Sequence, residues 1–440
     1  MRVDVKHPPP WLFVLTGMPY GVVGQFAVLV MPNMTERAGI EIGSIGWYSS
    51  LLYIPTVLLF LYAPLIDLGP RRKHWLILAS AIGAACLTAA FLMPLPEHKT
   101  AFLAFAFVAQ LISGLVGSCN GALMAAAMPD ELRGKASGWY QIGNVSGGGL
   151  SAMIAIWMLG HKYAPWIPGV TLAVMMMLPS LAVLSVDEPP RAPTTVRAVF
   201  RETLGDVGRV LFSKSGLTGI ALCVSPVGTA ALSNYFSGMT KPYSASDDTV
   251  ELANGLGILW TALGAGVAGY LCDRYNRRVL YLLSGTLTAL CGIVMALSPR
   301  TEWTYAIGVM TYALITGFCY SSFTATVLET IGKAGKSAGT QFSLFIAAGN
   351  LAILYVGLVD TRFSDDYGVE GVITSDAALN IAGVAILAVV FWRLGSFGKW
   401  RHPVAPPEPT SPASQTSPAS PPTAVELPAA IARITDKEIP

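Results

Sequence analysis

The chain has 440 residues, a net charge of +2 and a mean hydropathy of +0.55. Hydrophobic residues make up 53% of it and charged residues only 12%, which is about half the charged share of a typical soluble domain. So few charges cannot cover a water-facing surface, which excludes a soluble globular protein. The near-neutral total gives no indication of nucleic-acid binding. The six cysteines stand singly, so we expect no disulfide framework, no metal site and no cofactor.

Apolar runs of about twenty residues recur along the chain, each long enough to cross a hydrocarbon core of about 30 Å as a helix. The first run has spanning length rather than signal-peptide length, so we expect it to be retained. The predicted spans are 11–31, 44–66, 74–94, 101–128, 136–159, 166–186, 215–239, 250–272, 278–297, 302–328, 338–360 and 375–395. The sequence therefore predicts an all-α membrane protein with twelve transmembrane helices in two pseudo-repeated six-helix halves.

The polar segments set the expected boundaries. We expect a cytoplasmic N-terminus at 1–10, one bundle at 11–186, a cytoplasmic linker at 187–214 and a second bundle at 215–395. Residues 396–440 are rich in Pro, Ser and Thr, and such a segment cannot bury enough apolar surface to fold. We expect it to be a disordered cytoplasmic tail.

The lysines and arginines predict the orientation of the chain. Segments on one side of the membrane hold 22 of the 28 basic residues, and those on the other side hold the remaining 6. The positive-inside rule places the richer side in the cytoplasm. We therefore expect a multi-pass protein of the cell membrane with both termini in the cytoplasm.

The two halves repeat three short motifs in the same order, which is typical of transporters built from repeats with a binding site at their interface. One pair lies in the middle of spans 1 and 7, where Pro19-Tyr20-Gly21 matches Pro226-Val227-Gly228. Proline removes a helix donor, so backbone groups there can open toward a cavity. We expect Pro19, Gly21, Pro226 and Gly228 to act as hinges; ordinary kinks that serve packing are the alternative.

A second pair lies in the basic loops after spans 2 and 8. An Asp at a helix end can pair with a nearby Arg or with the N-terminus of a neighbouring helix, and such a clasp can close one side of the protein. The expected elements of this cytoplasmic gate are Asp67, Arg71, Arg72, Asp273, Arg277 and Arg278. The alternative is that the basic residues only enforce topology. The third pair is Gly134–Gly138 and Gly335–Gly339, before spans 5 and 11.

The loop segments 67–72 and 269–278 resemble the cytoplasmic signature of the major facilitator superfamily, roughly G-x-x-x-D-R-x-x-x-R-R. This resemblance implies a transporter that works by alternating access, with spans 1, 4, 7 and 10 lining its cavity. The segments 18–21, 45–49, 60–67 and 337–342 are similar to one branch, the AmpG-like muropeptide permeases and acetyl-CoA transporters. That branch implies proton-driven import of anhydromuropeptides across a bacterial inner membrane. Leu59 and Leu68 depart from the branch and the signature, which often have Lys and Arg there.

Neutral polar side chains lie at depth in the predicted spans, and no Asp, Glu, Lys, Arg or His lies near the middle of one. Amides and phenols suit a hydroxyl- or amide-rich solute better than a bare ion; interhelical hydrogen bonds are the alternative role of each. The expected cavity residues are Tyr20, Gln25, Tyr53, Asn120, Tyr140, Gln141, Asn144, Asn234, Tyr235, Asn254, Trp260, Tyr320, Gln341 and Asn350.

Proton coupling requires a titratable group on the path. Glu251 and Glu329 lie closest to the expected cavity helices, although both can also be boundary residues that face water. A facilitator or an exchanger without a proton carrier is the alternative.

The sequence thus predicts a secondary-active transporter that imports a polar sugar- or peptide-like solute with protons. An exporter of drugs or metabolites and a non-transporting membrane sensor are the alternatives. We expect no enzyme, because the five histidines all lie in loops or at span ends. We also expect a monomer, with the lipid bilayer, the solute and protons as its partners and no nucleic acid.

Overall fold

The structure, a computed structural model, describes residues 7–40, 42–68, 70–188, 201, 205, 208, 212–331, 338–395 and 397. They belong to one compact unit, Met1–Pro403. Every regular element in this described part is a helix. All of the expected tail except Phe397 and most of the expected linker lie outside the described residues, as does the 335–337 part of the third repeat motif.

The first half contains the elements of the first six predicted spans. Several of these spans are bent or locally rewound, so one span often contains more than one helical element. They are α1 (Leu12–Gln25), η1 (Phe26–Val30), α2 (Met31–Arg37), α3 (Ile42–Val57), α4 (Leu59–Tyr62), η2 (Ala63–Asp67), α5 (Arg72–Leu92), α6 (Lys99–Ala127), η3 (Asp130–Leu132), α7 (Arg133–Gln141), η4 (Ile142–Gly147), α8 (Gly148–Gly160), α9 (Trp166–Ser180) and η5 (Leu181–Ser185).

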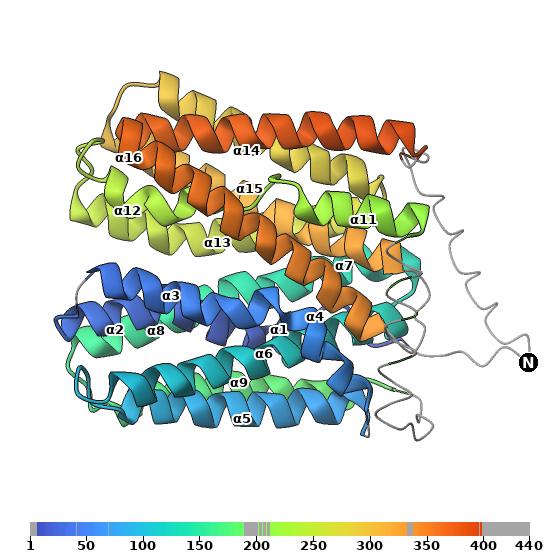
Figure 1. Ribbon diagram of the computed structural model, residues 1–440, viewed down its shortest axis with the longest axis horizontal. Coiled ribbons are helices and arrows are strands. Elements are labelled where there is room, and N and C mark those ends of the chain that lie inside the picture. Colours follow the sequence, from blue (N-terminus) through green and yellow to red (C-terminus); the bar gives the residue numbers. More distant parts are fainter. Residues whose placement is uncertain are drawn as a thin grey trace, which may run out of the picture. The chain divides into compact units, whose positions relative to one another are not determined.

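The second half begins at α11 and ends with one long helix that doubles back on itself (Figure 1). Its elements are α11 (Lys214–Val224), η6 (Ala231–Tyr235), α12 (Phe236–Met239), α13 (Asp247–Cys272), α14 (Arg277–Leu297), α15 (Glu302–Ile331) and α16 (Ala338–Arg393). Within α16 the backbone leaves the helical region at Gly368, with φ of +63°, and this break separates the eleventh predicted span from the twelfth.

Nine helices among the described residues are long and apolar enough to cross a membrane. The bent pair Trp47–Val57 and Leu59–Asp67, with an angle of 45°, makes a tenth span. The break in α16 adds another, and the seventh predicted span is interrupted between α11 and η6, which leaves it too short to count. The described helices therefore account for all twelve predicted apolar runs.

The two hinge motifs fold differently. Pro19 lies inside α1, which continues as a helix through Tyr20 and Gly21. In the second half, by contrast, α11 ends at Val224 and the chain is not helical from 225 to 230, where Gly228 has a φ of +64°. The expectation of a locally opened backbone therefore fails at the first motif and agrees with the structure at the second. We call residues 225–230 the broken segment.

Side chains bind the backbone groups that the broken segment leaves without helical partners. The N–H of Gly228 donates to Oδ1 of Asn380 at 2.9 Å, and the hydroxyl of Tyr281 donates to the carbonyl of Val227 at 2.9 Å. Tyr320 donates in the same way to the carbonyl of Thr229 at 3.3 Å. Buried backbone groups must be satisfied, and irregular backbone at membrane depth is tolerated only where protein or a cavity surrounds it.

Replacing Gly228 by alanine is expected to destabilise the protein. A left-handed residue with a side chain costs about 1–2 kcal/mol, and the added Cβ would lie 1.9 Å from Sγ of Cys319. We expect a lower thermal unfolding midpoint of the purified protein in detergent. Gly39→Ala is the matched control, because Gly39 has φ of +73° but open space around it. Equal losses in the two variants would show that the contact with Cys319 contributes nothing.

Buried apolar side chains show where the two halves join. We call the end of the bundle where α5 and α14 begin, with Asp67 and Asp273 just before them, the basic end. Near this end one continuous core includes side chains of both halves, among them Phe13 and Phe342. Toward the opposite end there are two separate cores, one around Phe26 in the first half and one around Tyr312 in the second. The halves are therefore packed together at the basic end and separated at the other.

Candidate transport cavity

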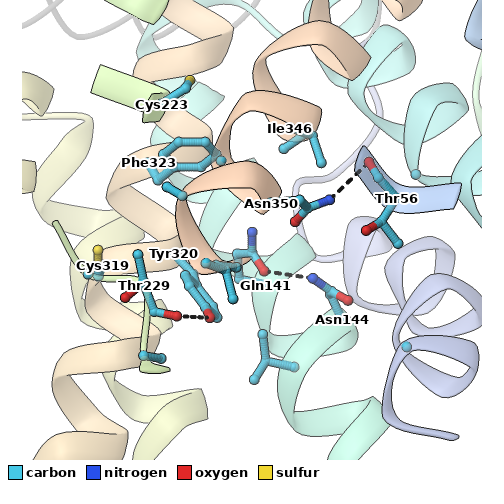
Figure 2. Close-up of a pocket in the computed structure, with 18 of the residues that line it drawn as sticks. Thr56, Gln141, Asn144, Cys223, Thr229, Cys319, Tyr320, Phe323, Ile346 and Asn350 are labelled. Carbon is cyan, nitrogen blue, oxygen red and sulfur yellow. Dashed lines mark hydrogen bonds between the residues drawn. The ribbon is translucent and has the colours of Figure 1, made fainter. Parts of the chain in front are cut away.

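A cavity of about 320 Å³ lies between the two halves. In the first half it is lined by residues of α1, α3, α6, α7 and η4, and in the second by the broken segment, α14, α15 and α16. Figure 2 shows side chains of both halves, such as Asn144 and Asn350, directed toward the same space. A solute in this cavity would therefore contact both repeats at once.

Nine of the fourteen residues expected in the cavity line it, together with the two hinge glycines. These are Tyr20, Gln25, Tyr53, Tyr140, Gln141, Asn144, Asn234, Tyr320 and Asn350, with Gly21 and Gly228. Most residues of the spans are apolar, so a polar side chain far from the span ends stands out in the sequence. Nine of the residues chosen in this way line the cavity. Their roles in binding a solute remain a proposal.

The other five expected residues lie elsewhere, for different physical reasons. Asn120 is fully buried and its amide donates to the carbonyls of Thr16 and Val116 at 2.7 and 3.1 Å, so it joins α6 to α1. Tyr235 bonds Thr361 at 2.7 Å beyond the broken segment. The remaining three are Asn254 and Trp260, which are exposed on α13, and Gln341, which lies in the first turn of α16. Pro19 and Pro226 are also absent from the lining.

Hydrogen bonds fix several of the lining amides, and some of these bonds cross between the halves (Figure 2). The amide of Gln141 donates to Oγ1 of Thr324 at 2.7 Å, and Asn144 donates to Oε1 of Gln141 at 3.0 Å. The amide of Asn350 donates to the carbonyl of Thr56 at 3.3 Å. Because the Gln141–Thr324 and Asn350–Thr56 bonds join the two halves, a motion that separates the halves at these points must break them.

The structure adds lining residues that the sequence did not indicate. Polar additions are Thr56, Gln110, Ser225, Thr229 and Ser233, and aromatic ones include Phe323 and Phe342. Gln110 is an amide deep in a predicted span, so the criterion used for the other amides also applied to it. That criterion does not single out Ser and Thr, because they occur throughout the spans and usually bond their own helix.

No Asp, Glu, Lys, Arg or His is among the described residues that line the cavity. Its polar groups are amides, alcohols and phenols, set among apolar side chains. Such groups can donate to and accept from hydroxyls and amides, but they cannot neutralise a charged ligand. Burying an uncompensated charge is costly, so the lining suits an uncharged polar molecule.

The cavity opens away from the basic end. Val28 of η1 and Ser233 and Asn234 of η6 line it and are exposed, and both elements lie in the parts of the first and seventh spans away from the basic end. Toward the basic end the lining residues Leu59 and Phe342 are each only 1% exposed. The ring of Phe342 packs against Gly121, so the second half seals the cavity against the first.

Asp273 forms a clasp between the halves at the basic end. Its Oδ1 accepts from the N–H of Gly134 at 2.7 Å and its Oδ2 from the N–H of Lys135 at 3.1 Å, at the first turn of α7. A carboxylate at a helix N-terminus is bound by free N–H groups and by the helix dipole. Burial raises the pKa of the Asp273 carboxyl to about 6, while Arg277 and the two N–H groups oppose the shift. Because the clasped carboxyl holds a proton more tightly than an exposed one, acidification toward pH 6 and below favours the clasped form.

Three arginines, from both halves, add further contacts at this end. Arg277 lies 3.6 Å from Glu329 and donates to the carbonyl of Asp130 at 2.5 Å, and Arg278 lies 3.5 Å from Glu329. Arg133 of the first half donates to the carbonyl of Leu328 in the second at 3.1 Å. Glu329 therefore belongs to the closed basic end and not to the cavity.

The first copy of the gate motif is arranged differently. Asp67 pairs with Arg72 at 3.0 Å inside the first half, and Arg71 is the N-cap residue of α5. Glu251, the other residue expected to couple protons, is exposed in the first turn of α13 and does not line the cavity. The expectation that Glu251 or Glu329 lies close to the solute path therefore disagrees with the structure, because helix ends place both at the boundary.

Comparison with known proteins identifies the fold. Residues 13–357 and 218–431 match the Major Facilitator Superfamily. No curated protein shows significant sequence similarity to the chain.

The solved structures that are similar to it include three transporters. The human organic anion transporter MFSD10 (TETRAN) has a TM-score of 0.67 and 16% identity, over 86% of this chain and 100% of that one. The proton:xylose symporter XylE bound to 6-bromo-6-deoxy-D-glucose has a TM-score of 0.65 and 14% identity, over 87% and 94%. The transporter FucP in the outward conformation has a TM-score of 0.64 and 14% identity, over 88% and 98%.

These identities are low, so the likeness concerns the fold, and it confirms the predicted all-α architecture of two six-helix halves. The family match extends over most of the chain. The chain therefore belongs to the Major Facilitator Superfamily and has the fold of its multi-pass membrane transporters.

Proposed function

We propose that this protein is a secondary-active transporter that moves an uncharged, hydroxyl- or amide-rich solute of about sugar size by alternating access. The observation that carries the proposal is the neutral polar cavity between the halves, open at one end and sealed at the other. Its volume of about 320 Å³ lies at the small end of the range for ligand pockets, roughly 300–1,000 Å³. This size favours a monosaccharide-sized solute.

We further propose import across the cell membrane, with the basic end in the cytoplasm. The distribution of Lys and Arg supports this orientation, and the cavity would then open to the outside. The likeness to the proton:xylose symporter XylE supports a sugar as solute and protons as the driving ion.

An anhydromuropeptide is the second candidate solute. It is favoured by Tyr20 and Gly21, two residues of the AmpG-like motif that line the cavity. However, such a molecule carries carboxylates, and the described lining contains no Lys, Arg or His to pair with them. The uncharged solute is therefore our first choice.

The test is uptake of labelled neutral monosaccharides and of a labelled anhydromuropeptide into proteoliposomes, with and without a proton ionophore. We expect accumulation of at least one monosaccharide that the ionophore abolishes, and no uptake of the anhydromuropeptide. Anhydromuropeptide uptake alone would reject the uncharged solute and support the second candidate. No uptake of either class by well-inserted protein would reject both.

Replacing Gln25 by alanine is expected to weaken solute binding. Gln25 lines the cavity and its amide has no hydrogen-bond partner among the described residues, so a solute can bond it without breaking a contact. Loss of one such bond costs about 0.5–1.5 kcal/mol, which is up to about tenfold in Kd. Asn254→Ala on the exposed face of α13 is the matched control, measured by the same equilibrium binding assay. Equal Kd values for Gln25→Ala and wild type would remove Gln25 from the proposed site.

A further inference from the structure

Two carboxylates are completely buried in the second half, away from the cavity lining. Asp360 and Asp376 are both 0% exposed on α16, on either side of the break at Gly368. Each lies eight residues from Gly368, which is about 12 Å along a helix. Asp360 is the last residue of the eleventh predicted span and Asp376 the second residue of the twelfth, yet both side chains are buried. Both acids therefore lie well inside the bundle.

The polar contacts of the pair are few and uncharged. Oδ1 of Asp360 accepts from the hydroxyl of Ser375 at 2.6 Å, while its Oδ2 is buried without a hydrogen-bond partner. Asp376 accepts from the hydroxyl of Tyr312, which lies 3.5 Å from its Oδ1 and 3.4 Å from its Oδ2. The groups facing the pair are Asp360 and Asp376 themselves, Tyr312 of α15, Cys291 of α14, and Tyr235 of η6, with exposed Asp365 farther out on α16.

No ion pair among the described residues includes either acid. The nearby arginines are already engaged at the surface, since Arg300 pairs with Glu370 and Arg362 with Asp366. Two carboxylates in one dry site without a cation cannot both stay ionised at reasonable cost, because charge burial and mutual repulsion add. A bound proton relieves both terms.

The helix turn that carries Asp376 is joined to the broken segment through Asn380. The amide of Asn380 donates to the backbone carbonyl of Asp376 at 2.9 Å, and its Oδ1 accepts from the N–H of Gly228 at 2.9 Å. The other face of the broken segment lines the cavity through Val227, Gly228 and Thr229. The broken segment thus lines the solute space and is hydrogen-bonded, through Asn380, to the helix turn that carries Asp376.

We propose that Asp376, together with Asp360, is the proton-binding site of this transporter, and that it couples to the solute through the broken segment. The proposal rests on the proton-driven transport proposed above. The step is reversible protonation: a carboxylate oxygen of the pair takes up one proton from water on one side and later releases it to water on the other, with no other bond formed or broken. An ionised carboxylate accepts a hydrogen bond more strongly than a neutral one, so protonation weakens the bond that Tyr312 donates to Asp376 and frees the turn of α16 that carries Asp376 and Asn380. The broken segment can then move with the solute bound to its other face.

The first test needs no solute. Infrared difference spectra of the purified protein across a pH titration should show the carbonyl band of a protonated carboxyl, and Asp376→Asn or Asp360→Asn should remove or shift it. Asp365→Asn is the matched control, because Asp365 is exposed on the same helix. A band that neither buried substitution changes would overturn the proposal, whatever the protein transports.

The second test separates coupling from transport, using the monosaccharide that the wild type accumulates. In proteoliposomes, Asp376→Asn should retain solute exchange at equilibrium, which needs no net proton movement, and lose accumulation driven by a pH gradient. Asparagine keeps the shape of the neutral acid and an acceptor for the hydroxyl of Tyr312, so folding should survive. Size-exclusion profiles check this, and Asp360→Asn provides a second variant. Normal gradient-driven accumulation in both variants would reject the site. Absence of accumulation in the wild type would instead count against the proposed function, with the infrared result still deciding on the proton site.

Discussion

Gly269→Leu is expected to hold the two halves apart at the basic end and to shift the protein toward the conformation that opens there. A Cβ on Gly269 of α13 would lie 2.9 Å from both the carbonyl oxygen of Gly134 and the Cα of Gly138, on α7 of the other half. These atoms belong to a helix backbone, so no side-chain rotation can relieve the contact. The clasp of Asp273 on the first turn of α7 lies beside it and would be lost at the same time.

We expect a large shift because one steric clash between the halves can supply the free energy needed to reverse the conformational equilibrium. Reversing a two-state equilibrium from 1:99 to 99:1 takes about 5.5 kcal/mol. The substitution lies between the halves, so each half should stay folded. Spin labels on His74→Cys of α5 and Arg393→Cys of α16, both exposed at the basic end, would report the separation of the halves. We expect the distance between the labels to increase.

Gly255→Leu is the matched control, because Gly255 lies on the same helix with no heavy atom within 4 Å of an added Cβ. It should leave the label distance as in the wild type. An unchanged distance in Gly269→Leu would mean that the halves do not part along the contact between α7 and α13, and the clasp would then be a static feature of the fold.

Gly21→Leu is expected to prevent the first half from folding. The added Cβ would lie 1.9 Å from the carbonyl oxygen of Asn144 in η4, and the reciprocal Gly143 would place its Cβ 1.9 Å from the carbonyl of Val14. Helix α1 and η4 thus touch backbone to backbone, the close approach that small residues allow in membranes. Forcing a leucine into this contact should cost more than about 4 kcal/mol, in the range of the most damaging single substitutions.

The measurement is the yield of monodisperse protein and its thermal unfolding midpoint in detergent. Gly24→Leu is the control, three residues further along α1, where an added Cβ meets no atom within 4 Å. If Gly21→Leu gave a stable protein with altered transport kinetics, Gly21 would act as the hinge expected from the sequence and not as a packing residue.

Hydropathy alone located the spans because a bilayer imposes a length and a composition on any helix that crosses it. The repeated motifs could also be recognised from the sequence, because equivalent positions in the two halves carry the same residues. The pattern did not reveal that Pro226 stands where the helix breaks while Pro19 stands in a continuous one. That difference depends on Asn380 and Tyr281, which supply partners for the opened backbone of the second half.

The polar residues show the same division. Asn120 and Asn144 are both amides at depth, and the sequence treats them alike. The structure turns Asn144 into the cavity and Asn120 against α1, because rotation of a helix about its axis is set by packing with its neighbours. Polarity therefore predicted a cavity, while the packing of the helices decided which amides reach it.

The sequence by itself determined the membrane-spanning character, the two-half organisation and the basic loops. Each follows from local composition, because the bilayer requires a certain length and polarity of each segment. Only the tertiary structure decided which end is closed, that Asp273 clasps α7 while Asp67 pairs within its own half, and that Asp360 and Asp376 lie buried together. The geometry of those features depends on how the helices pack against one another, which no local pattern records.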